Sequence, residues 1–344
     1  MNRHYKEGFS VRQYLLFGLI TFFTGIACVV LGSVSLPVSD IFYAVHNALG
    51  GLPLPEDTSA AIIIYVRLPR VIMAALVGAA LSLCGAAMQG LLRNPLADGT
   101  TLGVSSGASM GAVIAIAFGI SIPGIALAGT MVMAIAFAFL SMALILGLAY
   151  KLDFSLSTNT IILIGVIFSM FANSITSLVV TFAGSKAKNI LFWTMGSLSG
   201  NSYRNVIILL AALILGSIII LRYSRELNAF AIGEENARHI GVDVKNVKLK
   251  ILIAVSALIG VCVSVSGTIG FVGLVMPHIM RLIVGPNHKK LLPASIFGGA
   301  VFLMLADLVS RTILNPLELP IGVVTSFIGS IVFVYIFYRN RKAR

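Results

Sequence analysis

Charged side chains are scarce in this 344-residue chain: they make up 10% of the residues, whereas 58% are hydrophobic. A soluble domain carries roughly 25% charged residues, and the mean hydropathy of this chain is +1.02. These values exclude the soluble globular class. We expect an all-α integral membrane protein, because the apolar runs are too long and too unalternating to form barrel strands.

Motifs for catalysis and nucleotide binding are also missing. The chain contains no Gly-x4-Gly-Lys-Ser/Thr loop, no His-Glu-x-x-His and no Gly-x-Ser-x-Gly, which would indicate ATP binding, zinc hydrolysis and serine hydrolysis. We therefore expect no enzymatic activity, and no cofactor or metal held by this chain. The five histidines are scattered without metal-ligand spacing: His4, His46, His239, His278 and His288.

Only three cysteines are present, Cys28, Cys84 and Cys262, and each falls within an apolar run. Their spacing fits neither a disulfide framework nor a metal site. We expect them to pack as small hydrophobic residues between helices.

Apolar runs of about 20 residues, the length that crosses a bilayer, occur along the whole chain. The first run is too long for a secretory signal, so we expect a retained helix. Residues 36–66 contain several prolines and glycines and are predicted to form an outside loop. We expect one membrane domain over residues 1–344, in which the run at 270–284 is short enough for a half-length helix. The ten predicted helices cover 14–34, 69–91, 101–119, 122–150, 159–183, 204–222, 249–266, 270–284, 291–310 and 320–338.

The positions of the 24 Lys and Arg residues predict the topology. Most fall in short loops on one side of the ten predicted helices, which the positive-inside rule makes the cytoplasmic side. Both termini then lie in the cytoplasm. The net charge of +12 indicates attraction to anionic lipid and no nucleic-acid partner. Six cations would remain at or near the outside: Arg67, Arg70, Lys186, Lys188, Arg204 and Arg311.

Residues 234–241 form a charged island in this apolar chain, read as Glu-Glu-Asn-Ala-Arg-His-Ile-Gly. Basic residues lie in it or follow it closely (Arg238, Lys245, Lys248, Lys250), which predicts a cytoplasmic position. We interpret the island as the part of a cytoplasmic loop, about 223–248, that another protein binds.

The six outside cations have two interpretations. Their stems can snorkel to lipid headgroups, with Asp307 and Arg311 forming an i,i+4 pair. Alternatively, the arginines form a face that docks acidic residues of a partner, because guanidinium binds carboxylates bidentately. Asp307 could also relay protons, but an arginine one turn away favours a structural pair.

Helix 159–183 carries polar residues at helical spacing: Ser169, Asn173, Thr176 and Ser177. Such groups either hydrogen-bond to neighbouring helices or line a polar path through the bundle. Ser157, Thr158 and Asn159 stand where this helix begins. They either cap it or form a constriction that closes the path.

Several stretches together resemble the FecCD family of ABC importer permeases, over residues from about 10 to the C-terminus. A weaker internal similarity joins Arg93-Asn94-Pro95 and Gly285-Pro286-Asn287, since each closes one predicted helix before the next. It indicates two related halves, as transporters often show. The stretches that carry the resemblance are, in order, Arg67-Leu68-Pro69-Arg70; Gly78-Ala79-Ala80-Leu81; Met88-Gln89; Asn94-Pro95-Leu96-Ala97; Gly103-Val104-Ser105-Ser106-Gly107-Ala108; Gly233-Glu234 with Ala237-Arg238 and Gly241; Gly270-Phe271-Val272-Gly273-Leu274 with Pro277-His278; Ala306-Asp307 with Arg311; and Glu318-Leu319-Pro320-Ile321-Gly322-Val323-Val324-Thr325.

The resemblance implies a type II ABC importer permease in the cytoplasmic membrane of a prokaryote. It implies a homodimer or heterodimer of permease chains, two ATPase subunits that hold ATP and Mg, and an extracytoplasmic substrate-binding protein. By position, Gly233, Glu234, Ala237, Arg238 and Gly241 match the loop that couples to the ATPase. Arg67, Arg70 and Arg311 match the arginines that dock the binding protein, and Ser157, Thr158 and Asn159 match the cytoplasmic gate.

The implied cargo is a ferric siderophore, with haem and cobalamin as alternatives. An ion-coupled secondary transporter is the other class that we consider. It would need ion ligands in mid-membrane, and the one candidate, Asp307, is expected to pair with Arg311.

Overall fold

The computed structural model describes residues 8–34, 36–51, 58–99, 102–122 and 128–342, and these are mostly helical. The expected all-α membrane fold is confirmed. Seven helices are long and apolar enough to cross a membrane, and three shorter apolar helices complete the expected set. The ten are α1 (Val11–Val30), α4 (Leu68–Leu91), α5 (Val104–Phe118), α6 (Ala128–Leu152), α7 (Thr158–Phe182), α9 (Tyr203–Arg222), α12 (Val244–Ser266), α13 (Val272–Val284), α14 (His288–Thr312) and α15 (Ile321–Lys342).

The prediction of a loop over residues 36–66 is wrong. Pro37 and Gly51 mark the two ends of a helix, α2 (Val38–Gly50), and Gly51 adopts the left-handed conformation that commonly ends helices. Residues 58–67 are helical as well, as α3 (Thr58–Ala61) and the π-type segment η1 (Ile62–Arg67) that leads into α4. The expected turns at Pro53 and Pro55 lie outside the described residues, as do the tail cations Arg3, Lys6 and Arg344.

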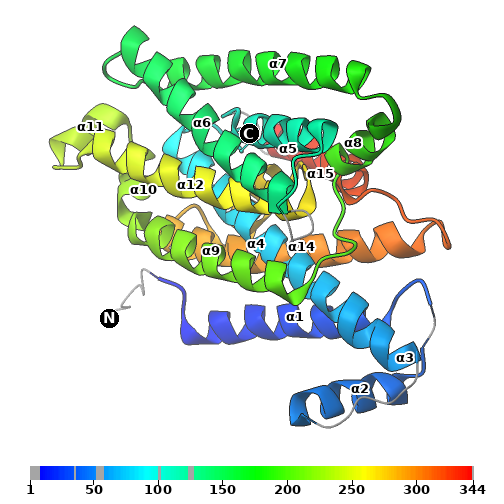
Figure 1. The fold of residues 1–344 in the computed structure, drawn as a ribbon. Coiled ribbons are helices and arrows are strands. Elements are labelled where there is room, and N and C mark those ends of the chain that lie inside the picture. Colours follow the sequence, from blue (N-terminus) through cyan, green and yellow to red (C-terminus); the bar gives the residue numbers. More distant parts are fainter. Residues whose placement is uncertain (1–7, 35, 52–57, 100–101, 123–127, 343–344) are drawn as a thin grey trace, which may run out of the picture.

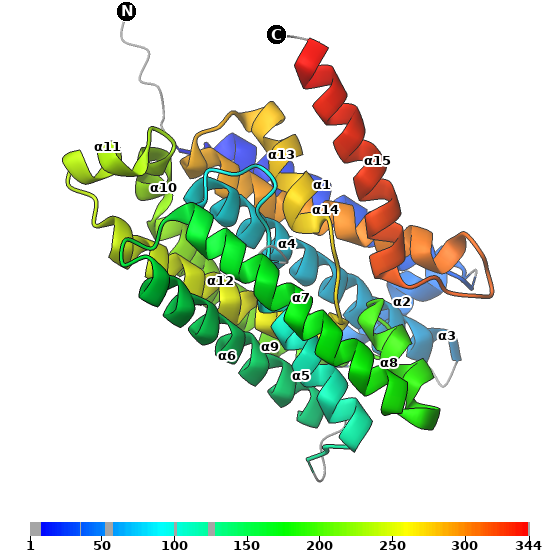
Figure 2. The ribbon, with the colours of Figure 1, turned by 90° about the horizontal axis from the view of Figure 1, so that it is seen from above.

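Four further short helices lie in the connections: η2 (Gly184–Lys186), α8 (Ala187–Thr194), α10 (Ser224–Phe230) and α11 (Glu234–His239). The long helices run roughly side by side (Figure 2), with α10 and α11 at one end of the bundle and α2, α3 and α8 at the other (Figure 1). The chain therefore presents two different ends, one of them carrying the charged island.

The centre of the bundle is built by α4, α12 and α14, whose residues are mostly buried, whereas α1, α6, α7 and α9 expose apolar faces. α4 packs closely along α14. A Cβ atom at Gly78 would lie 2.2 Å from the Gly299 carbonyl oxygen, and one at Gly299 would lie 2.2 Å from that of Gly78. Glycine is needed at both positions because the two backbones touch, as is common where membrane helices associate. The cysteines Cys28, Cys84 and Cys262 are buried and unbridged, as expected.

Replacing Gly78 by leucine is expected to destabilise the bundle, because the new side chain must push α14 away from α4. Overpacking of this kind costs about 1–3 kcal/mol, and occasionally more. The measurement is the midpoint of thermal unfolding in detergent. Gly18→Leu is the matched control, since a Cβ atom at Gly18 meets no atom within 4 Å. Equal midpoints for both variants would contradict the close contact of α4 and α14.

Two stretches without regular helix, 195–202 before α9 and 267–271 before α13, pack against each other, whereas a third, 313–320 before α15, is mostly exposed. Ser197 N donates to Ser266 O at 2.9 Å, and Gly322 N donates to Met195 O at 3.1 Å. Non-helical backbone at membrane depth is tolerated only where protein buries it or where it lines a cavity. These stretches therefore indicate where a cavity should lie.

Candidate functional site: a hydroxyl-lined cavity and a charged segment at one end of the bundle

A cavity of about 790 Å³ opens beside the irregular stretch that follows α12. Its walls come from α4, α5, α7, α8, α12 and α15 together with residues 267–270, and none of the lining side chains is charged. Nine of its ten polar lining residues carry a hydroxyl group. The polar lining residues are Ser105, Ser106, Ser109, Asn173, Thr176, Ser177, Thr194, Ser266, Thr268 and Ser326.

Two of the three short apolar helices begin at this cavity and occupy equivalent places in the chain. α5, with 15 residues, follows α4, and α13, with 13 residues, follows α12. Ser105 and Ser106 at the start of α5 line the cavity, as do Ile269 and Gly270 just before α13. Short helices at corresponding positions of two related halves indicate a transporter's substrate path. The arrangement makes this cavity the candidate path through the chain.

Three of the four residues in the polar stripe of α7 line the cavity: Asn173, Thr176 and Ser177. The Ser177 hydroxyl donates to Asn173 O, one turn back on its own helix, at 3.0 Å. The fourth, Ser169, does not line the cavity, and its hydroxyl donates to Gly165 O at 2.9 Å. The geometry thus places three residues of the stripe, and not the fourth, on the candidate path.

The residues matched to a gate lie far from that cavity. Ser157, Thr158 and Asn159 stand at the opposite end of α7, about 28 Å along the helix from Ser177 at 1.5 Å per residue. They line a second pocket of about 570 Å³, shared with Arg93 and residues 232–236. The stripe and the three gate residues therefore belong to two separate hollows joined by one helix.

Asp153 organises the chain just before α7. Its carboxylate accepts hydrogen bonds from the Ser155 hydroxyl at 2.6 Å, the Ser155 amide at 2.9 Å and the Ser157 amide at 3.1 Å. Ser157 occupies the N-cap position, but its hydroxyl pairs with the Thr160 hydroxyl at 2.9 Å and caps no amide. Ser157 therefore does not cap the helix with its side chain, and Asp153 holds the turn.

Hydrogen bonds from Ser155 and Ser157 keep the pKa of Asp153 below its usual range. Because the folded pKa is the lower one, the carboxylate stabilises the turn fully above the unfolded value of about 3.9, and this stabilisation is lost as the pH falls through the folded pKa. Between pH 5 and 8 the turn should not respond to pH. Asp153→Asn should lower amide-exchange protection in 155–161 several-fold throughout this interval. Unchanged protection would contradict the organising role of Asp153.

The charged island forms α11, preceded by Gly233 and followed by Gly241, both at positive φ (115° and 89°). The short helix has two faces. Ala237 is fully buried and Glu234 is half-buried, whereas Arg238 and Ile240 are exposed. Of the five residues matched to ATPase coupling, Arg238 and Gly241 are thus accessible to a partner, while Glu234 and Ala237 face the chain itself.

Glu234 contacts one of the gate residues directly. The Thr158 hydroxyl donates to Glu234 Oε1 at 2.9 Å, and the Lys248 ammonium donates to the same oxygen at 2.7 Å. From the sequence, Lys248 was expected only to be one of the loop cations, and its contact with Glu234 was missed. A helical stripe could have identified it, since Val244, Ile251 and Leu252, one turn before and after it, are all buried.

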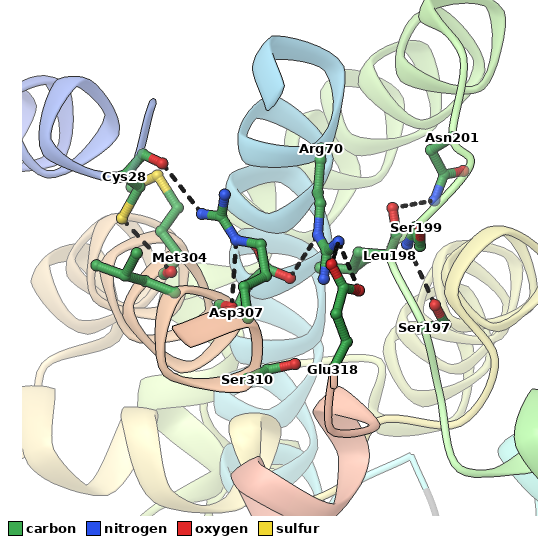
Figure 3. Close-up of polar contacts among 12 residues, drawn as sticks. Cys28, Arg70, Ser197, Leu198, Ser199, Asn201, Met304, Asp307, Ser310 and Glu318 are labelled. Atoms are coloured by element: carbon green, nitrogen blue, oxygen red, sulfur yellow. Dashed lines mark hydrogen bonds and ion pairs between the residues drawn. The ribbon is translucent and has the colours of Figure 1, made fainter. Parts of the chain in front are cut away.

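The three arginines matched to docking do not form an open face. Arg67, Arg70 and Arg311 are 4%, 6% and 4% exposed. Asp307, which is fully buried, has Arg70 Nε 3.0 Å from Oδ1 and Arg311 Nε 3.0 Å from Oδ2. Figure 3 shows Arg70 between Asp307 and Glu318. Both carboxylate oxygens of Glu318 lie 2.9 Å from Arg70 Nη1.

Arg67 is also engaged within the chain, donating to the carbonyl oxygens of Val29 and Val30 at 3.0 and 3.1 Å and to that of Val34. The expected pair of Asp307 and Arg311 is confirmed. The interpretation that these three arginines snorkel to lipid headgroups is wrong, because carboxylates and backbone carbonyls of the chain bind their guanidinium groups. Lys186, Lys188 and Arg204 are exposed as expected of outside cations. The matched role of Arg67, Arg70 and Arg311 in docking a partner stays a prediction.

Among the described residues, His, Cys, Asp and Glu side chains form no group of three or more that could hold a metal ion. The polar groups of the cavity are neutral hydroxyls and one amide.

Comparison with known proteins agrees with this geometry. The family model of the FecCD transport family matches residues 19–339. The uncharacterized ABC transporter permease protein YvrB of Bacillus subtilis is 45% identical over 98% of this chain and 94% of its own length. The cobalamin import system permease protein BtuC of Halobacterium salinarum is 38% identical over 94% of this chain and 85% of its own.

A solved structure, described as an inward-facing conformation of a metal-chelate type ABC transporter, superposes with a TM-score of 0.84 at 31% identity. The match covers 96% of this chain and all of the other. Such relatives are permease subunits of ABC importers, multi-pass proteins of prokaryotic cell membranes. The resemblance stated from the motifs is thereby confirmed, and the chain belongs to the FecCD transport family.

Proposed function

We propose that this chain is the permease subunit of a binding-protein-dependent ABC importer, and that its substrate is a metal chelate which passes through the 790 Å³ cavity. The single observation that carries the proposal is this uncharged, hydroxyl-lined cavity, at which the two equivalent short helices α5 and α13 begin. ATP hydrolysis takes place on separate subunits. The family membership and the solved metal-chelate transporter support the class.

The ATPase subunit binds the end of the bundle that carries α10 and α11, which is the cytoplasmic end in this proposal. The exposed side chains there combine charge with apolar surface: Arg238 is accessible, and Ile232 and Ile240 are 58% and 65% exposed. Large apolar side chains exposed next to an arginine are typical of anchors in a protein interface.

Arg238→Glu combined with Ile240→Asp should weaken binding of the ATPase subunit by at least about tenfold, as the loss of interface anchors does. The measurement is co-purification of the ATPase with the tagged permease, followed by titration in detergent. Lys188→Glu, on the exposed α8 at the other end, is the matched control. If the double variant retains the ATPase as well as the control does, α11 is not the contact.

The binding protein docks at the opposite end in this proposal. Of the two acids that hold Arg70, only Glu318 is accessible, with 40% of its side chain exposed. A carboxylate of the partner would have to take the place of Glu318 to reach Arg70, whereas Lys186, Lys188 and Arg204 are open to it directly. The docking of an acidic partner through Arg67, Arg70 and Arg311 therefore requires rearrangement of the 313–320 stretch.

A ferric siderophore leads as the cargo, with haem and cobalamin next. All three are metal chelates, the class named for the solved relative, and cobalamin is named for the Halobacterium relative. The cavity is open on the side of α7, where the lining residues Asn173 and Ser177 are exposed. A second permease chain, identical or related, would close it there.

The test is ATP-dependent uptake into proteoliposomes that hold this chain, its ATPase and its binding protein. The panel comprises ferric siderophores, haem and cobalamin. Uptake of one compound that requires ATP supports the proposal. Uptake that ignores ATP and follows a proton gradient would replace it with the ion-coupled secondary transporter, although both oxygens of Asp307 already face arginines.

A further inference from the structure

Lys248 is a fully buried cation near the start of α12, a few residues after the charged island. Its ammonium lies 2.7 Å from Glu234 Oε1 and donates to Leu156 O at 2.9 Å. A buried charge is kept only where a counter-charge and hydrogen bonds satisfy it. Lys248 is thus fixed to two segments at once, the first residue of α11 and the turn that precedes α7.

Glu234 also contacts the helix that follows this turn. The same carboxylate oxygen accepts from Lys248 and from the Thr158 hydroxyl, so one oxygen joins α11, α12 and the start of α7. Leu156, whose carbonyl Lys248 binds, has a positive φ of 53°, a conformation that costs a residue with a side chain roughly 1 kcal/mol or more. The turn is therefore held in a strained form by Lys248 on one side and by Asp153 on the other.

The short helix α10, which precedes the charged island, is fixed to a different part of the chain. The Asn228 amide nitrogen on α10 donates to Asn287 Oδ1 at 2.9 Å, and Asn228 Oδ1 accepts from the His288 amide at 2.8 Å. These bonds tie α10 to the start of α14. Glu234 on α11, by contrast, bonds to Lys248 on α12 and to Thr158 on α7, the helix that carries Asn173, Thr176 and Ser177 into the cavity wall.

We propose that Lys248 is a positioning residue that transmits movement of α11 to α7: its ammonium holds Glu234 of α11 to Leu156 in the turn before α7, and Glu234 itself contacts Thr158. The inference rests on the proposed function. In it, the exposed face of α11 binds the ATPase, and the inward face passes its displacement to the helix that forms one wall of the path. Lys248 touches neither substrate nor ATP.

The test uses the complete importer in proteoliposomes and measures substrate transported per ATP hydrolysed. Lys248→Met removes both contacts while keeping a long apolar side chain, and should lower this ratio about tenfold, within the usual range of coupling between sites. Lys250→Met changes an exposed lysine two residues away and should leave the ratio within about twofold of the wild type. Lys248→Arg, which keeps the charge, should restore part of the ratio.

A purely structural role would reduce the amount of assembled importer and would leave the ratio unchanged. Spin labels at the exposed Glu235 and Asn159 separate the two roles further: in wild type their distance distribution should stay the same when ATP is added, and in Lys248→Met it should change. If Lys248→Met does not assemble, Thr158→Val and Glu234→Gln carry the same test, each with a lowered ratio expected.

The double variant Glu234→Gln/Lys248→Met should transport no less per ATP than the worse single variant, because both residues belong to one connection. Losses that multiply, or a wild-type ratio in Lys248→Met, would overturn the inference. A wild-type importer that shows no ATP-dependent uptake would instead overturn the proposed function, so the two failures are distinguishable.

Discussion

Asp307→Asn is expected to prevent the chain from folding stably. The amide keeps the shape of the carboxyl but leaves the guanidinium groups of Arg70 and Arg311 buried without their shared counter-charge. Removing one partner of a buried ion pair costs about 3–5 kcal/mol, a large part of the 5–15 kcal/mol that typically stabilises a protein. The measurement is the fraction of monodisperse protein after extraction, with the midpoint of thermal unfolding in detergent.

Glu318→Gln is the matched control for this prediction. It removes the other acid that binds Arg70, but Glu318 is partly exposed, and Arg70 keeps Asp307. The control should fold with a midpoint close to wild type. If Asp307→Asn unfolds no earlier than Glu318→Gln, Glu318 is sufficient for Arg70 and the Cys28 carbonyl oxygen, to which Arg311 donates at 3.0 Å, is sufficient for Arg311, and the ion pairs with Asp307 do not hold α4 to α14.

Ser177→Trp is expected to abolish uptake without loss of folded protein. Ser177 lies in the wall of the cavity on α7 and is exposed toward it, so a bulky ring there enters the proposed path and disturbs no packed core. We expect uptake to fall at least tenfold, which corresponds to about 1.4 kcal/mol or more of added activation free energy. The assay is ATP-dependent uptake into proteoliposomes, normalised to assembled importer.

Gly147→Trp tests whether bulk alone is harmful. A Cβ atom at Gly147 meets nothing within 4 Å, and the residue lies on an exposed face of α6 away from the cavity. This variant should transport as wild type does. Full uptake by Ser177→Trp would show that substrate does not pass this wall, and the candidate path would have to lie elsewhere.

The helices could be predicted from the sequence because their signal is local. A run of apolar residues is long enough to span a bilayer or it is not, and most predicted ends agree with the structure within a few residues. α12 begins five residues earlier than predicted, at Val244 instead of 249. Lysines at 245 and 248 were taken as loop residues, although lysine is a good helix former.

Turn residues were the less reliable signal. Pro37 and Gly51 were taken for turns of a loop, but they stand at the start and end of α2, positions where proline and glycine are also common. The charged island at 234–241 was singled out by its charge, and most of it forms α11. Charge could not reveal that Glu234 faces inward while Arg238 faces outward.

The sequence by itself determined the membrane class, the all-helical fold, the family and the local pair of Asp307 and Arg311, because each depends on composition or on neighbours within one helical turn. Only the tertiary structure decided that Arg70 shares Asp307, 237 positions away, and that Lys248 joins Glu234 to the turn before α7. The cavity also depends on the tertiary structure, since its walls come from six helices spread over the chain. Periodicity reports which side of a helix is buried, but the partner buried against it depends on how all the helices pack together.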